Sequence, residues 1–446
     1  MNYLVKYIVV PFLYLTFLLS KVHAGQADNL SFPEQSDKCL SPTKYYQKKH
    51  DNSDLYSLFN GCSKLLTYIK QSSFDDLSLV FANPTLSTPM SYFGHTFLVF
   101  RKKESLNFSK VFSFSAITPE KMPFLELFNK GIFGGLDGRY SFANFYDVKK
   151  EYLDKEQRSL VFYKLQFTTI EKNLLLLKAY ELYNVQTTYN FFNKNCTTEL
   201  LAFLSFVKPE LISLIDKTSS YFQPSELVDL LMKKKLVSKI SHTLSPDLDK
   251  FNLSYFSKNT NDRQMIIDYI NKDSELDYED ITDAMKSDIS LVSNIKFEYE
   301  KEPLLNFIEI NNFRYKLPIS PSFQPKVETK ISQMAPNEIR YGYGYDFSNN
   351  TTFLVLGFKP SFISRDQVRI SPIYSGTLNI LDTELTFSND SLFVSKFNFI
   401  EIESFAKNIY IFSLNSWRFL LGTGNYLNID DNLKWDVDFA YGKTWG

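Results

Sequence analysis

The stretch HTFLVFRK, residues 95–102, decides the fold of the first half of the chain. Its four central residues are apolar without alternation, which indicates a strand buried on both faces of a sheet. KVFSFSAI (110–117) follows after a polar turn, so we expect the two segments to pair as a β-hairpin. SLVFANP (78–84) and LVFYKLQF (160–167) read as further strands of the same core.

Helical and glycine-rich segments separate these strands. Thr168 offers an N-cap to the helix IEKNLLLLKAYELYNV, with Glu171 in its first turn. CTTELLAFLSFV (196–207) predicts another helix, which begins at a cysteine. GIFGGLDGRY (131–140) contains four glycines, so we expect a loop whose backbone turns tightly or approaches another group closely.

Composition limits the class of protein. The 446 residues allow about three domains. Lys+Arg is 49 and Asp+Glu is 50, which argues against a generic basic nucleic-acid binder. The three cysteines and four histidines form no CxxC or HExxH spacing, so we expect neither a metal nor a cofactor.

The N-terminus indicates export. Residues 1–24 combine a lysine, a short apolar run and the small-x-small pattern of Val22 and Ala24, which predicts a cleaved signal peptide; the alternative is a retained membrane anchor. Export permits disulfides. Cys39 and Cys62 lie close in sequence and are candidates for a bridge that would staple the N-terminal region. Cys196 then remains as a reactive thiol or a buried apolar side chain.

The last third of the chain has a different pattern of apolar and polar residues. IRYGYGYDF (339–347) and LKWDVDFAYG (433–442) alternate strictly between apolar and polar residues, and similar stretches make about six strands. Apolar-out, polar-in alternation with many aromatic residues is typical of an outer-membrane β-barrel, although a sheet packed on a core shares it. Six strands cannot close a barrel, so we expect an incomplete barrel or a sheet that a partner completes.

Two residues have the types and positions that a thiol nucleophile needs. Cys196 lies in the first turn of a helix, where the helix dipole stabilises a thiolate. His95 starts a buried strand and is a candidate base for the thiol proton. Backbone amides at the helix start would form an oxyanion hole. The alternative is a core histidine and an inert buried cysteine.

The strings LVFANPTLSTPMSYFGHTFLVF, GIFGGLDGRYSFANFYDVKKEYLDKEQRSL and YNFFNKNCTTELLAFL resemble the Lnb N-terminal periplasmic domain family of bacterial envelope proteins, over about residues 77–235. The order of histidine and cysteine is also more distantly similar to circularly permuted NlpC-type papain-like hydrolases and acyltransferases. These resemblances imply an α+β, permuted papain-like domain with Cys196 as nucleophile and His95 as base. The strand after His95 offers only Ser113 and Ser115 to orient the imidazole, and Ser115 is a weak candidate. Further positions expected to border the cleft or shape its turns are Gly94, Asn195, Thr197, Gly134 and Gly135.

Two functions compete, with a weaker third. The first is an envelope thiol hydrolase or acyltransferase that acts through an acyl-cysteine on cell-wall or lipid material. The second is a non-catalytic scaffold or assembly protein of the periplasm and outer membrane. Glycan processing by carboxylates such as Glu199 or Asp137 is suggested only by the family's name, and no spacing singles out a pair.

We expect the outer membrane as a partner and no nucleic acid.

The expected divisions of the chain follow from these patterns. The predicted regions are a signal peptide (1–24), a helical N-terminal region (25–77), the periplasmic papain-like domain (78–238), a polar linker (239–320) and a C-terminal antiparallel β region (321–446).

Overall fold

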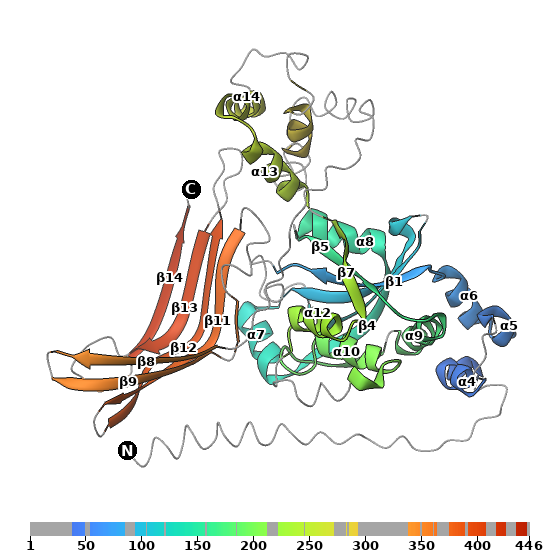
Figure 1. Ribbon diagram of the computed structural model, residues 1–446, viewed down its shortest axis with the longest axis horizontal. Coiled ribbons are helices and arrows are strands. Elements are labelled where there is room, and N and C mark those ends of the chain that lie inside the picture. Colours follow the sequence, from blue (N-terminus) through green and yellow to red (C-terminus); the bar gives the residue numbers. More distant parts are fainter. Residues whose placement is uncertain are drawn as a thin grey trace.

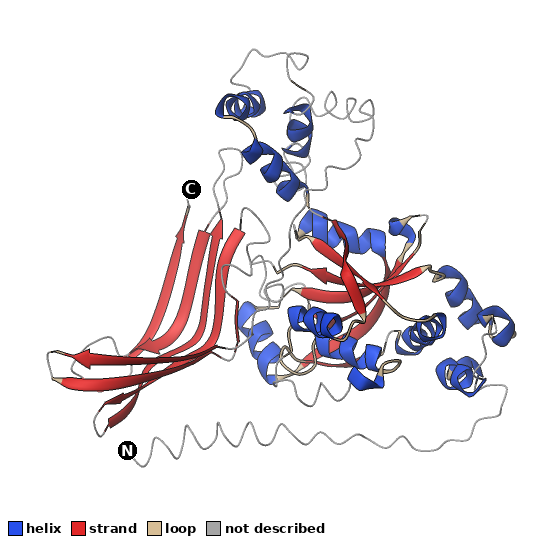
Figure 2. Cartoon of the chain, in the orientation of Figure 1, coloured by secondary structure: helices blue, strands red, loops and turns tan. Residues whose placement is uncertain are grey.

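The structure is a computed structural model with α+β architecture, built on two antiparallel sheets (Figures 1 and 2). It describes residues 38–49, 54–84, 94–103, 105–119, 122–156, 158–183, 185–211, 222–244, 246–271, 282, 285–292, 338–347, 350–359, 361–363, 374–388, 391–406, 416–424 and 434–443. The predicted signal peptide lies outside these residues. No helix in the described ranges is long and apolar enough to cross a membrane.

The first sheet has seven antiparallel strands in the order β6-β4-β3-β2-β1-β5-β7. The strands are β1 (Asp76–Ala82), β2 (His95–Arg101), β3 (Lys110–Ile117), β4 (Leu136–Asn144), β5 (Leu160–Leu165), β6 (Gln186–Tyr189) and β7 (Val237–Leu244). The predicted hairpin of β2 and β3 is present. β7 continues this sheet past residue 238, where we expected the domain to end.

Helices cover both faces of this sheet (Figure 1). The helices along this part of the chain are α4 (Pro42–Lys49), α5 (Leu55–Leu58), α6 (Ser63–Gln71), α7 (Phe124–Phe133), α8 (Phe145–Lys149), α9 (Thr169–Leu182), α10 (Cys196–Ser205) and α12 (Pro224–Lys233). Two short helices, α13 (Asp247–Ser257) and α14 (Thr260–Asn271), follow the sheet.

The core of this domain lies on both sides of β2. Leu98 and Phe100 face the cluster made with α9, α10 and α12, whereas Phe97 and Val99 face the cluster made with α8. All four side chains are at most 1% exposed, so the prediction of a strand buried on both faces is confirmed. The predicted cap of α9 is also present, since the Thr168 and Glu171 side chains each bond the other residue's backbone amide.

The glycine-rich segment 131–140 is not the loop that we expected. Helix α7 continues to Phe133 and strand β4 begins at Leu136, so only Gly134 and Gly135 connect them. The other glycines make room for aromatic rings. A side chain at Gly131 would overlap the ring of Phe191, and one at Gly138 would overlap the ring of Phe114.

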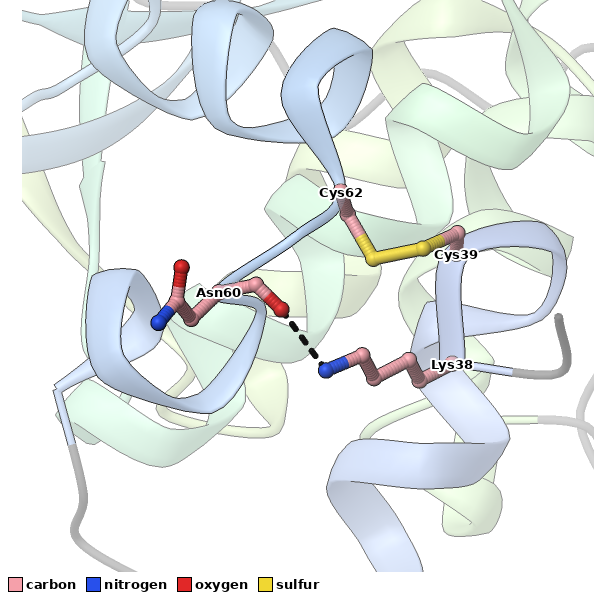
Figure 3. Close-up of a disulfide and its surroundings, with 4 residues drawn as sticks. All are labelled: Lys38, Cys39, Asn60 and Cys62. Atoms are coloured by element: carbon pink, nitrogen blue, oxygen red, sulfur yellow. Dashed lines mark hydrogen bonds between the residues drawn. A yellow bond between two sulfur atoms is a disulfide. The ribbon is translucent and has the colours of Figure 1, made fainter. Parts of the chain in front are cut away.

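A disulfide cross-links two parts of the N-terminal helical region (Figure 3). It joins Cys39 to Cys62, the residue that precedes α6, across 23 positions with the Cα atoms 5.4 Å apart. The Lys38 ammonium donates a hydrogen bond to the Asn60 carbonyl at 2.7 Å beside it. Because the cross-link restricts the unfolded chain, it favours the ordered arrangement of α4, α5 and α6.

The second sheet is formed by the six predicted C-terminal strands and one short addition. Its order is β14-β13-β12-β11-β9-β8, with β10 paired to β11. The strands are β8 (Glu338–Asp346), β9 (Thr351–Lys359), β10 (Ser361–Ile363), β11 (Tyr374–Ser388), β12 (Ser391–Ala406), β13 (Ser416–Gly424) and β14 (Lys434–Gly442). The described strands form a curved open sheet, not a closed barrel (Figure 2).

Candidate active site

Helix α10 begins at Cys196 because Asn195 caps it. The Asn195 side-chain oxygen accepts hydrogen bonds from the backbone amides of Thr197 (2.8 Å) and Thr198 (3.0 Å). Its side-chain nitrogen donates to two backbone carbonyls of neighbouring segments. Asn195 therefore fixes the helix start, and Cys196 occupies the first helical position, where the helix dipole favours an anion.

The sheet opens beside this helix end. Only Leu98, Val99 and Phe100 of β2 pair with β3. Strand β3 stays paired with β4 as far as Ile117. His95 therefore lies where β2 has separated from β3 but still pairs with Ala82 of β1. The backbone N–H of Thr96 donates to the Cys196 sulfur, which places the thiol at this opening.

Cys196 and His95 form a hydrogen-bonded pair at the opening. Burial raises the pKa of the Cys196 thiol, whereas the charge and hydrogen bond of His95 lower it. The Thr96 amide and the Thr197 hydroxyl, which lies 3.7 Å from the sulfur, lower it further, and the pKa falls to about 6. Although only 5% of Cys196 is exposed, the lowered pKa favours its thiolate form at neutral pH.

A backbone donor is available next to this sulfur. The two amides that follow Cys196 bond the Asn195 side chain, and no acceptor among the described residues bonds the N–H of Cys196 itself. An amide in this position can donate to the oxyanion that forms when the sulfur attacks a carbonyl carbon. The helix start thus carries the Cys196 thiol and a backbone donor beside it.

Tyr152 holds the His95 imidazole by stacking. The two rings are nearly parallel, at 14°, with centroids 6.1 Å apart, and the Phe97 ring packs against both. Tyr152 belongs to the π-helical turn η4 (Lys150–Lys155), and such turns are frequent at functional sites. The stack restricts rotation of the imidazole, a task that a polar third residue performs in cysteine and serine hydrolases.

Arg158 supports Tyr152 from a buried position. Its guanidinium carbon lies 4.8 Å from the Tyr152 ring centroid. The same group donates to the carbonyls of Asn83 (2.7 Å) and Ala82 (3.1 Å) and to the Glu156 carboxylate (2.7 Å). Because Arg158 is only 4% exposed, it ties the end of β1 rigidly to the aromatic side of the site.

A second tyrosine lies near the sulfur. Burial raises the pKa of Tyr152 and of Tyr189, the last residue of β6, and the negative charge of Cys196 raises both further. Both phenols therefore stay protonated at neutral pH. Both rings thus lie close enough to Cys196 for its charge to act on their hydroxyl groups.

The structure does not bring the predicted orienting serines to His95. Ser115 is exposed and pairs across the sheet with Arg139, and no hydrogen bond joins it to His95 in the described residues. The Ser113 hydroxyl bonds Ser141 at 2.9 Å instead. The cause is the separation of β2 from β3, which carries Ser115 away with β4.

Gly134 and Gly135 have the conformational role that we weighed for them. Their φ angles are +93° and +115°, a region that side chains rarely adopt. No atom lies within 4 Å of the space that a Cβ of Gly134 would fill, so the backbone turn alone requires glycine there.

Gly94, directly before His95, is constrained in two ways. Its φ is +81°, and a Cβ there would lie 2.8 Å from the Phe81 ring and 2.9 Å from the Ala82 carbonyl. We expect Gly94→Ala to lower the free energy of unfolding by about 2–4 kcal/mol, since strain and overlap add. Gly134→Ala, with strain alone, should cost about 1 kcal/mol. Chemical denaturation of both variants measures the difference, and equal losses would contradict the overlap with Phe81.

Three residues of this site escaped the sequence analysis: Tyr152, Arg158 and Tyr189. Arg158 carried one available signal, because it is a charged residue two positions before the apolar run of β5. The carboxylate of Glu199, considered for glycan chemistry, accepts a hydrogen bond from the Tyr140 hydroxyl. Within the described ranges no three His, Cys, Asp or Glu side chains are grouped to hold a metal ion.

Two family models match the chain. Residues 65–233 match the Lnb N-terminal periplasmic domain, which confirms the resemblance seen in the sequence and identifies an exported envelope protein. Residues 335–446, which hold the second sheet, match a domain of unknown function (DUF7840). Comparison with curated proteins and with solved structures found no match.

Proposed function

We propose that the Lnb N-terminal periplasmic domain of this chain, residues 65–233, is a cysteine-dependent hydrolase or acyltransferase of the cell envelope. The observation that carries the proposal is the hydrogen-bonded pair of Cys196 and His95 at the start of α10. An inert core cysteine would have its pKa raised by burial, whereas this one is lowered to about 6.

The proposed reaction has two steps. The Cys196 thiolate attacks the carbonyl carbon of an amide, ester or thioester, and the N–H of Cys196 donates to the developing oxyanion. His95, which holds the proton taken from the thiol, gives it to the leaving group. Water or an acceptor hydroxyl or amine then attacks the acyl-cysteine, with His95 accepting its proton, and the thiolate is restored.

The location supports an envelope substrate. A periplasmic domain meets peptides of the cell wall and acyl chains of lipids, and both contain bonds of the required kinds. A papain-like descent with a permuted chain order belongs to the same proposal, because the helix-borne cysteine and strand-borne histidine fit that arrangement. Tyr152 takes the orienting place that the sequence assigned to Ser115.

The test is the pH dependence of Cys196 alkylation by iodoacetamide in the folded protein. We expect an inflection near pH 6 that moves above about 8.5 in His95→Ala, because burial then acts without its opposing charge. The position of the inflection is the readout, since a less basic thiolate is also a weaker nucleophile.

A matched control removes a different imidazole. His242 lies on β7, paired with β5 at the far side of the sheet, and His242→Ala should leave the inflection unchanged. A thiol that reacts only in denaturant would refute the proposal. The competing function, a non-catalytic envelope scaffold, would then account for the domain.

A further inference from the structure

One face of the second sheet carries no charged side chain among the described residues. Paired residues of neighbouring strands lie on the same face, and successive residues alternate. A single row of pairs crosses all six main strands, from β8 to β14, through Ile339, Phe358, Thr383, Phe397, Thr423 and Trp435. The apolar residues of β8 and of β14 therefore share this face, which we call the apolar face.

The apolar face is buried at its centre, where Leu378, Ile380, Ile400 and Ile402 form a cluster, but its edges are exposed to an unusual degree for large apolar residues. On β8, Ile339, Tyr341 and Tyr343 are 72%, 86% and 76% exposed. On β14, Trp435, Val437, Phe439 and Tyr441 are each 65–72% exposed. Soluble proteins rarely expose apolar patches of this extent unless something binds there.

The opposite face gathers the charged groups of the sheet and pairs them. The next row contains Arg340, Gly357, Glu384 and Lys396. Arg340 forms ion pairs with Asp382 and Glu384, and Lys396 pairs with Asp382 at 3.0 Å. The missing side chain at Gly357 leaves the space through which Arg340 reaches across β9.

A second network lies farther along the same face. Arg418 of β13 pairs with Glu401 (3.0 Å), Glu403 (3.4 Å) and Asp438 (3.1 Å). Each charge thus has a partner on its own side of the sheet. The charged groups of these two networks therefore do not contribute to binding on the apolar face.

The strand lengths fit one kind of occupant. The four outer strands β8, β9, β13 and β14 have nine residues each, whereas the central β11 and β12 have 15 and 16. A tilted strand needs about 9–11 residues to cross the hydrocarbon of a bilayer, so the outer strands have the length for it. Tyrosine and tryptophan suit the boundary between hydrocarbon and water. A protein partner would ordinarily meet a charged rim around the apolar centre, and no described residue of this face is charged.

From these observations we infer that the exposed β8 and β14 edges of the apolar face contact the acyl chains of a lipid bilayer. The inference does not depend on Cys196. It requires that the β8 and β14 edges find hydrogen-bond partners in the membrane, because open strand edges do not persist in hydrocarbon.

Bromine quenching of Trp435 fluorescence tests the contact directly. The chain has three tryptophans, so Trp417→Phe with Trp445→Phe leaves Trp435 as the single reporter in the full chain. We expect phosphatidylcholine vesicles with brominated acyl chains to quench Trp435, and unbrominated vesicles not to. The readout is local to the sheet, so an apolar segment elsewhere in the chain cannot imitate it.

Two neighbouring substitutions on β14 provide the matched comparison. Phe439 lies on the apolar face and Ala440, paired with Arg418, lies on the opposite face; both are exposed. We expect Phe439→Lys to lower vesicle partitioning by roughly tenfold or more and Ala440→Lys to change it by less than about twofold. Phe439 is 67% exposed, so its replacement removes little packing, and circular dichroism verifies the fold.

Three results would overturn the inference. They are unquenched Trp435 in protein that floats with vesicles, equal losses in both lysine variants, and failure to bind vesicles at all. Concentration-dependent self-association with Trp435 protected but unquenched would assign the face to a second copy of the chain instead.

Discussion

Replacing Cys196 with alanine is expected to abolish acylation of the protein by p-nitrophenyl acetate. The Cys196 thiolate attacks the acetyl carbon and expels p-nitrophenolate, so the wild-type protein should show a rapid burst and an acetyl group on Cys196. The rate should fall at least about a thousandfold in Cys196→Ala, since no other side chain takes over the attack. Absorbance of p-nitrophenolate follows the burst, and mass spectrometry locates the acetyl group.

The cysteine pattern makes this experiment clean. Cys39 and Cys62 are joined in a disulfide, so Cys196 is the single free thiol of the three cysteines. His95→Ala should slow the burst by about 10²–10⁴-fold, the usual contribution of a positioned acid or base. A burst that survives in Cys196→Ala would locate the nucleophile elsewhere.

Ser115→Ala is the matched control for the orienting residue. Ser115 is exposed on β3 and bonds no described atom of His95, so its loss should change the burst rate by less than about twofold. A large effect would return Ser115 to the site. A small one, together with slow acylation when Tyr152 is replaced by leucine, would support orientation by ring stacking.

The regular elements could be predicted because their signals are local. The unbroken apolar run of residues 97–100 predicts a strand with two apolar faces, and the alternation in residues 339–347 predicts a strand with one apolar and one polar face. Both strands are present. The start of α10 could be predicted for the same reason, because a capping residue such as Asn195 bonds backbone amides two and three positions later in the chain.

The support of the site could not be predicted because it arises from tertiary packing. Tyr152 meets His95 only after a π-helical turn folds onto β2, and no spacing in the chain announces a stack between residues 57 positions apart. The prediction of a loop from the glycines of residues 131–140 was wrong for a related reason. Gly131 and Gly138 serve the rings of distant residues, and a count of glycines cannot distinguish that use from a turn.

Arg158→Met is expected to lower the free energy of unfolding by about 3–5 kcal/mol. Methionine keeps much of the apolar stem but leaves the carbonyls of Ala82 and Asn83 without their donors and Glu156 without its cation. Loss of one partner from a buried ion pair costs about this much, because the remaining polar groups stay desolvated. Arg158→Lys retains the charge without the planar fork and should lose an intermediate amount. Urea denaturation measures all three proteins.

The control is Lys155, a charged residue of the π-helical turn η4 three positions before Arg158. Lys155 pairs with Glu151 at 2.9 Å, but their side chains are 60% and 51% exposed, so Lys155→Met should change stability by less than about 0.5 kcal/mol. Arg158→Met should also raise the pH of the Cys196 alkylation inflection, because Tyr152 loses the cation that supports it and the imidazole is held less firmly. A destabilised variant with an unchanged inflection would make Arg158 a purely structural residue. An unchanged stability would contradict the buried network itself, and with it the rigid link from β1 through Tyr152 to His95.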